Sequence, residues 1–262
     1  MVLAMVKRKN KSQCGEEDLP DAQKDLLLYI LQHGPSPAYG THKILKRPQS
    51  TVQTSMKELK DAGLVGLYGK EEGEKGGTKL MYGLTLHGFC YGFNLIVRSE
   101  TTTYELIERL INRWQHLCPV VLGNWNHLIA GRQEDCSFPE GCGERKYFWE
   151  GVQLPYQVPN MKVKHWIIFI NGICAQTSRE SLYREATPET FISFFCEQVY
   201  DQVINRPDIS DDPDYRWDIE YILCVIRNIP ELWEYVRRDL VCWRESFRRS
   251  DYNIQWALNE WD

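Results

Sequence analysis

The sequence of 262 residues lacks a long apolar run, and no stretch approaches the roughly 20 apolar residues that a membrane-spanning helix needs. The apolar residues 1–6 are too few for the core of a signal peptide. The basic residues 7–9 follow them, whereas a signal peptide carries its basic residues first. We therefore expect a cytoplasmic protein with no membrane partner.

Catalytic and repeat signatures are also missing. The chain contains no GxSxG, HExxH or P-loop motif, and no repeat at the periods typical of solenoids. Gly141-Cys142-Gly143 places small residues around a nucleophile, but no partner base can be assigned, and such glycines are typical of loops. We therefore expect neither enzyme activity nor a cofactor.

Nine cysteines are scattered through the chain without a CxxC pair. Free cysteine is among the most buried residue types, so we expect reduced, buried thiols, for example at Cys196, Cys224 and Cys242 in apolar helical patterns. Whether Cys136 and Cys142 bind a metal or sense oxidation stays open. Their five-residue gap lacks the second pair that zinc sites usually have, so no metal is expected.

The composition supplies ample material for a core, with 9 Trp, 14 Tyr and 9 Phe, and the length favours two domains. The net charge of −5 is unevenly divided: residues 1–100 carry 14 Lys and Arg against 11 Asp and Glu, and the remainder carries 17 against 25. A mildly basic N-terminal part fits DNA binding, whereas the acidic remainder does not suit a DNA surface.

The N-terminal part begins with a polar, basic arm over residues 1–20, which is expected to be disordered. Its lysines and arginine either follow a DNA backbone or are merely solvated. Helices are predicted over residues 21–33 and 39–46, with Ile44 and Leu45 facing inward, and the Gly-Pro-Ser-Pro segment 34–37 breaks the chain between them.

A third helix is predicted after Pro48. Ser50 is a good N-cap, Gln53 three residues later completes a capping box, and Gly63 is a natural stop. The apolar residues that recur on one face at helical spacing are Val52, Met56, Leu59 and Ala62.

Two strands are predicted next, over residues 64–68 and 80–84, joined by a glycine-rich tip. Leu80, Tyr82 and Leu84 alternate with Met81 and Gly83, as in a half-buried strand. A fourth helix is expected to follow, up to Val97.

This order of three helices, two strands and a glycine-rich tip resembles the winged helix-turn-helix domain of prokaryotic transcription regulators of the broad MarR/PadR-like class. The residues that carry the resemblance are Thr51, Val52 and Leu59 in the third helix, Ala62-Gly63-Leu64-Val65 after it, and Tyr82-Gly83-Leu84-Thr85 with Gly88 after the wing. The expected fold is mainly α: a winged helix-turn-helix over residues 21–97, made of three helices and a β-hairpin wing, followed by a larger, mostly helical dimerisation or effector domain over 98–262.

The resemblance implies that the third helix enters the major groove and contacts base edges with its N-terminal half, where amides suit adenine and hydroxyls or an ammonium suit phosphate. A Gln53 that closes a capping box is less free to do so. The expected contacts are Gln49, Ser50, Thr51, Gln53, Thr54 and Lys57 on this helix, Thr41, His42, Lys43, Lys46 and Arg47 against phosphates, and Lys70, Lys75 and Lys79 on the wing.

The wing has no net charge, because Lys70, Lys75 and Lys79 are matched by three glutamates. A wing that grips phosphates is usually more basic, since affinity grows with the number of phosphates neutralised. This hairpin therefore either contacts DNA through its lysines alone or points away from DNA.

Residues 98–262 contain apolar segments, 120–130 and 163–174, whose pattern fits either a helix or a strand. Prolines 188, 213 and 230 mark helix starts. The apolar stripe of the last helix, Trp233, Val236, Leu240, Trp243 and Phe247, is either core or a dimer seam. Aromatic residues in this part either line an apolar pocket for a small-molecule ligand or are simply core.

The sequence thus predicts a sequence-specific DNA-binding regulator of transcription. Because such proteins usually pair to match two half-sites of double-stranded DNA, a homodimer is expected, through the last helix or through residues 104–117. The alternative is a winged helix that binds protein and not DNA, which the neutral wing and the acidic remainder favour.

Overall fold

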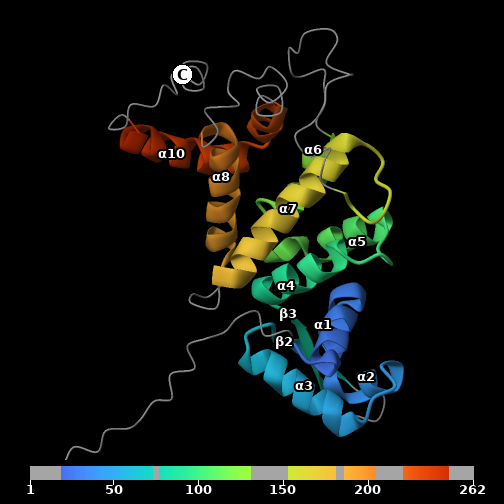
Figure 1. Cartoon of the computed structure of the whole chain (residues 1–262). Helices are drawn as coiled ribbons and strands as arrows, with labels where there is room; N and C mark the ends of the chain where they lie inside the picture. The colour runs from blue at the N-terminus through green and yellow to red at the C-terminus, as the bar shows by residue number, and fades with distance from the viewer. Residues whose placement is uncertain (1–18, 73–76, 131–152, 181–185, 205–220, 248–262) are drawn as a thin grey trace, which may run out of the picture.

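In the computed structural model the protein is mainly helical, with one small antiparallel sheet (Figure 1). The structure describes residues 19–72, 77–130, 153–180, 186–204 and 221–247. The N-terminal elements are α1 (Asp21–His33), β1 (Ser36–Pro37), α2 (Ala38–Ile44), α3 (Gln49–Asp61), β2 (Val65–Glu72), β3 (Thr78–Leu84) and α4 (Leu86–Val97). After these come α5 (Tyr104–Trp114), the 3-10 helices η1 (Gln115–Leu117) and η2 (Leu122–Asn124), α6 (Trp125–Ala130), α7 (Met161–Glu180), α8 (Pro188–Ile204), the helical residues 221–227, and α10 (Pro230–Phe247).

The predicted mainly helical fold is confirmed, and several helices begin where the sequence places them. α8 and α10 start at Pro188 and Pro230, where a proline loses no helical hydrogen bond. The apolar run 163–174, which left helix and strand open, lies inside α7. The predicted start at Pro213 falls outside the described residues, and the domain boundary after Val97 stays a prediction.

The sheet has the strand order β1-β3-β2, with both pairs antiparallel. The predicted alternation along the returning strand is wrong: exposure rises steadily outward, from 5% at Leu84 to 42% at Leu80. The hairpin extends away from the core, so distance from the core decides the burial of its side chains more than the strand face does.

The hairpin joins α4 through a close backbone contact. The Leu64 carbonyl accepts a hydrogen bond from the Thr85 amide at 3.1 Å, and a Cβ built on Gly88 would lie 1.9 Å from the same oxygen. The Thr85 hydroxyl caps α4 by accepting from the Gly88 amide at 3.0 Å and donates to the Gly63 carbonyl at 2.6 Å. Only a glycine at position 88 allows the start of α4 to rest on the turn that follows α3.

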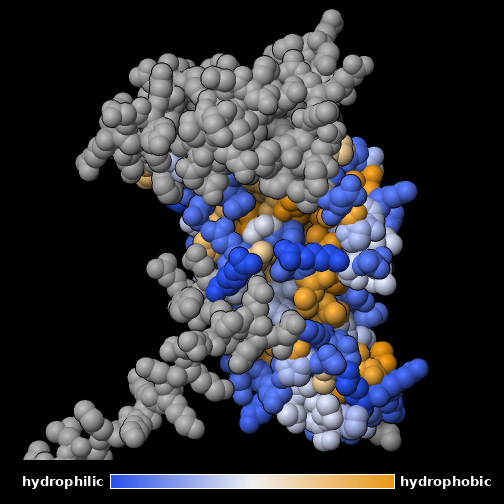
Figure 2. Space-filling view, viewed as in Figure 1, coloured by the Kyte–Doolittle hydropathy of each residue, from blue (hydrophilic) through white to orange (hydrophobic). Residues whose placement is uncertain are grey.

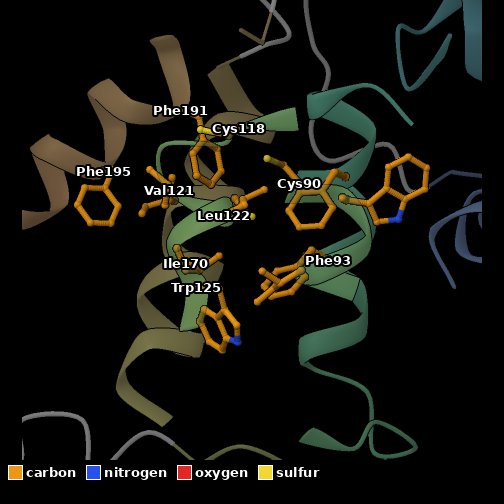
Figure 3. Close-up of a cluster of buried hydrophobic side chains, with 14 of the residues drawn as sticks. Cys90, Phe93, Cys118, Val121, Leu122, Trp125, Ile170, Phe191 and Phe195 are labelled. Carbon is orange, nitrogen blue, oxygen red and sulfur yellow. The ribbon is translucent and has the colours of Figure 1, made fainter. Parts of the chain in front are cut away.

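α4 links the two ends of the molecule. It packs against α1 on one side and α7 on the other, and lies between them in Figure 1. Figure 3 shows Cys90 and Phe93 of α4 facing Leu122 and Ile170 in a continuous buried cluster. A second link comes from α5, because the Trp114 indole N–H donates to the Leu31 carbonyl at 2.8 Å.

The expectation of buried, reduced thiols holds at four described positions: Cys90, Cys118, Cys174 and Cys196 are free and buried. It is wrong at Cys242, which is exposed because it lies on a different face of α10 from the buried Leu232 and Val236. It is also wrong at Cys224, which forms a disulfide. Burial raises the pKa of the Cys118 thiol to about 12, so this thiol stays protonated at neutral pH.

Replacing Gly88 by alanine is expected to destabilise the protein by about 3 kcal/mol, because the new methyl group overlaps the Leu64 carbonyl and the surrounding backbone must shift. Gly172→Ala is the matched control: it lies inside α7, where a Cβ meets only the flexible Gln198 side chain at 3.5 Å. That variant should gain about 0.5–1 kcal/mol from helix propensity. Urea unfolding followed by circular dichroism measures both, and equal stabilities of the two variants would contradict the packing described.

The core also predicts a pH dependence of stability. Burial among Trp166, Phe169 and Tyr221 lowers the pKa of His165 from 6.5 to about 3. Below pH 6.5 the unfolded chain binds a proton that the folded chain does not. Folding stability should therefore fall, by up to about 1.4 kcal/mol per pH unit, as the pH decreases from 6.5 toward 3.

The test compares urea midpoints at pH 7 and pH 5 for the native chain, for His165→Phe and for a control, His127→Phe, at an exposed position. The fall in the urea midpoint between pH 7 and pH 5 should be much smaller in His165→Phe than in the native chain. In the control, His127→Phe, it should be as large as in the native chain. Burial also lowers the pKa of His87, so a residual slope of the same sign remains in every variant. An unchanged slope in His165→Phe would contradict the assignment.

Candidate nucleic-acid interface

The predicted cap of α3 is wrong. α3 begins at Gln49, its first i to i−4 hydrogen bond runs from the Val52 amide to the Pro48 carbonyl at 3.2 Å, and no side chain of the described residues caps it. Because Pro48 occupies the N-cap position, Ser50 lies inside the first turn and forms no capping box. The exposed Gln53 side chain is therefore not engaged at the helix end.

α3 presents a polar face to solvent. Its opposite face is buried against α1 and the core through Val52, Ser55, Met56 and Leu59. The exposed side chains that share the outward face at helical spacing are Ser50, Gln53, Thr54 and Lys57. Figure 1 shows α3 at the lower end of the molecule, where the space-filling view of Figure 2 is mostly blue to white, the colours of polar residues. Thr51 is half-buried, and Gln49 is exposed beside this face.

α2 departs from its prediction. Tyr39 and Gly40 are not helical, with Gly40 at φ +99°, a conformation that favours glycine. Thr41 is buried and its hydroxyl donates to the Pro37 carbonyl, so it cannot reach a phosphate. Ile44, expected inward, is 61% exposed, because the turn of chain at Gly40 shifts the phase of the short helix that follows.

Two cations lie between α2 and α3. Lys46 is exposed at a left-handed φ of +51° and lies just before the start of α3. Arg47 is already paired: its Nε donates to Asp25 Oδ2 at 2.9 Å, and its guanidinium makes a second contact with the same oxygen. Asp25 belongs to α1, so Arg47 ties the α2–α3 turn to α1 and has little charge left for a phosphate. Lys43 is exposed and His42 is half-buried.

The hairpin carries a bulge at Tyr68, between the paired positions Leu67 and Gly69. The Tyr68 ring lies over Gly83, where a Cβ would come within 2.8 Å of it, and packs edge-on to His116 at 6.0 Å between ring centroids. The bulge thus brings β2 against η1.

The charges of the hairpin are matched strand to strand. Glu71 lies directly opposite Lys79 in the ladder, and Lys70 lies opposite the uncharged Leu80. Opposite charges at such positions attract, so Lys79 is partly neutralised within the sheet. Lys70 and Lys79 are exposed, and Lys75 falls outside the described residues, as does the basic arm.

A polar hollow of about 420 Å³ lies at the edge of the contact between α1 and α3, beside the outward face. Its lining includes Gln23 of α1 and Ser50, Thr51, Thr54 and Glu58 of α3. The Gln23 amide donates to Glu58 Oε2 at 2.7 Å across it. The Glu58 carboxylate makes this hollow unfavourable for an anionic group such as a phosphate.

Sequence reasoning missed a group of exposed apolar side chains near the proposed interface: Tyr39, Ile44, Leu67, Tyr68 and Leu80. Figure 2 shows hydrophobic colour over α2, next to the polar surface of α3. The patterns of α2 and β3 had suggested buried positions, so only the structure reveals this surface.

No family model, no curated protein and no solved structure matches this chain. Among the described residues, no group of three His, Cys, Asp or Glu side chains is arranged to hold a metal, and Cys136 and Cys142 fall outside these residues. No helix in the described part of the chain is long and apolar enough to cross a membrane.

Proposed function

We propose that residues 21–97 act as a winged helix-turn-helix domain and that the protein is a sequence-specific DNA-binding regulator of transcription. The observation that carries this proposal is the outward face of α3, where Ser50, Gln53, Thr54 and Lys57 are exposed on a helix whose opposite face is fully buried. A helix held in this way can enter a major groove without unfolding any part of the core.

The chemistry of this face supports base contact. A glutamine amide can form two hydrogen bonds with an adenine edge, and hydroxyls and an ammonium suit bases or phosphates. Because Gln53 does not cap the helix, both the carbonyl oxygen and the NH2 group of its side-chain amide are available. The proposed base contacts are Gln53 and Thr54, with Gln49 and Ser50 at the start of the helix.

Phosphate contacts are few. Among the described residues that the sequence analysis placed against DNA, the exposed lysines are Lys43, Lys46, Lys57 and Lys70, once Arg47, which is bonded to Asp25, and Lys79, which lies opposite Glu71 in the ladder, are set aside. Four phosphate contacts give a slope of log K against log salt of about −3.6 per protomer, which is shallow. This charge balance favours a protein whose affinity depends on base contacts and pairing.

We also propose that the protein acts as a homodimer, because two copies would double these contacts across two DNA half-sites. The apolar face of α5 is not available as its seam, since Ile107, Leu110, Ile111 and Trp114 are buried inside the protomer. On α10, Leu232 and Val236 are likewise buried, and the side chains of Leu240, Trp243 and Phe247 fall outside the described residues. A regulator of the prokaryotic class that the sequence resembles works in the cytoplasm.

Selection of bound fragments from random DNA, using the full chain, tests binding and specificity together. We expect an enriched motif with two-fold symmetry, and light scattering at micromolar concentration should give a dimer mass. Recovery of unenriched DNA, or no DNA at low salt, would overturn the proposal.

Replacing Lys46 and Lys57 together by alanine should reduce the salt slope by about 1.8 per protomer, because each lysine accounts for about 0.9. The matched control is Arg237→Ala with Arg238→Ala on α10, which removes the same two positive charges far from α3. Fluorescence anisotropy at several salt concentrations measures both. Equal losses in the control would show that only net charge matters.

Asp25→Asn should strengthen DNA binding, because it frees the Arg47 guanidinium for a phosphate, and should raise the salt slope by about 0.9 per protomer. The cost in folding stability should be about 0–1 kcal/mol, since the ion pair is partly exposed. The double variant Asp25→Asn with Arg47→Ala should return to the native slope. A gain that persists in the double variant would contradict the role given to Arg47.

The alternative, a winged helix that binds protein and not DNA, is favoured by one observation: the exposed Tyr39 and Ile44 beside α3 and the exposed Leu67 and Tyr68 on the hairpin. Exposed apolar groups of this kind often mark protein contacts. A protein partner that is lost in Ile44→Asp, with DNA binding absent in the native chain, would favour this function.

A further inference from the structure

A cavity of about 640 Å³ lies where the end of α4 meets α7, α8 and the segment of residues 153–155. This volume is within the range of about 300–1,000 Å³ that small-molecule sites occupy. Its apolar wall comes from Val97, Leu154, Pro155, Ile168, Phe169 and Ala175. Gly172 lines it too, and the missing side chain keeps part of the volume open.

The apolar wall is held in place from behind. The Phe169 ring lies edge-on to Trp166 at 5.4 Å and to Phe195 at 5.2 Å between ring centroids. Both of these partners are fully buried in the core. The wall is therefore rigid before any ligand arrives, which lowers the entropy cost of binding.

Asn171 lines the cavity and carries a polar atom that lacks a partner. The Asn171 carbonyl oxygen Oδ1 is buried and has no hydrogen-bond partner within the part of the chain that the structure describes. A buried acceptor without a donor is costly, and native proteins usually satisfy such groups. A bound molecule that donates an O–H or N–H to this oxygen would remove the cost.

The rim selects against charge of either sign. Arg98 and Glu100 both line the cavity and are exposed, so a positive and a negative group stand at the same opening. An anion that approaches Arg98 is repelled by Glu100, and a cation that approaches Glu100 is repelled by Arg98. A neutral ligand experiences neither repulsion.

We propose that this cavity binds an uncharged, amphipathic small molecule, with its apolar body against Ile168 and Phe169, and that the Asn171 side chain turns toward the ligand so that a hydroxyl or amide N–H donates to its Oδ1. The site lies at the C-terminal end of α4, whose N-terminal end rests on the turn after α3 through Gly88 and Leu64. α4 is about 18 Å long, so it connects the two places as one rigid element. On the proposed function, which this step assumes, occupation of the cavity regulates DNA binding by α3.

Three related probes test the binding site on the full chain by calorimetry: 2-naphthol, which is neutral and has a donor; 2-methoxynaphthalene, which is neutral and has none; and 2-naphthoate, which is an anion. We expect one molecule of 2-naphthol per chain, bound about two- to tenfold more tightly than 2-methoxynaphthalene, as one hydrogen bond provides. 2-Naphthoate should bind more weakly than 2-naphthol.

Variants assign the binding to the cavity. Asn171→Leu should reduce 2-naphthol affinity to that of 2-methoxynaphthalene, and Ala175→Phe, which fills the cavity, should abolish binding of all three probes. Asn112→Leu, at an exposed position of α5 outside the cavity, is the matched control. If Ala175→Phe fails to fold by circular dichroism, Gln198→Phe fills the cavity from α8. No binding at millimolar probe, or unchanged affinities in the Asn171 and filling variants, overturns the site.

The regulatory step has its own measurement. Saturating 2-naphthol should change the affinity for the selected DNA by about fivefold or more in the native chain and not in Ala175→Phe. If saturating 2-naphthol leaves the DNA affinity unchanged, the proposed regulation is overturned. The calorimetry with the three probes still decides whether the cavity is a binding site. If the chain binds no DNA at all, the proposed function fails and the cavity is judged by the probes alone.

Discussion

The contact between the Leu64 carbonyl and the start of α4 determines how the two ends of this protein sit relative to one another. That oxygen accepts from the Thr85 amide, and the absence of a side chain at Gly88 lets α4 approach it. The same Thr85 hydroxyl caps α4 and bonds the Gly63 carbonyl, at the turn where α3 ends. The end of α3, the hairpin and the first turn of α4 are therefore fixed as one backbone unit.

Helix positions could be predicted from the sequence wherever local chemistry decides them. α1 spans the predicted residues because its apolar positions recur at helical spacing and Gly34 stops it, and Pro188 and Pro230 mark the starts of α8 and α10. The run Trp166–Ile170 could not be assigned, because a helix buried on several sides loses the periodicity that distinguishes it from a strand.

The candidate interface was predictable in outline and not in detail. The exposed side chains of α3 were identified because they alternate with Val52, Met56 and Leu59 at helical spacing. The pairing of Arg47 with Asp25 was not visible, since it joins residues 22 apart, with β1 and α2 between them in the chain. The burial of Thr41 and exposure of Ile44 depend on the backbone at Gly40, which spacing alone does not reveal. The cavity beside Asn171 depends on tertiary packing of separate segments.

The bond from the Trp114 indole to the Leu31 carbonyl has a consequence for how the chain comes apart. Leu31 lies in the last turn of α1, where carbonyls have no partner within the helix, and the Arg113 side chain donates to the neighbouring Gln32 carbonyl. A fragment cut after Val97 would lose both donors and expose the buried face that α4 turns toward α7. We therefore expect α1 and α5 to unfold together, so that residues 21–97 alone would be less stable than the same residues within the full chain.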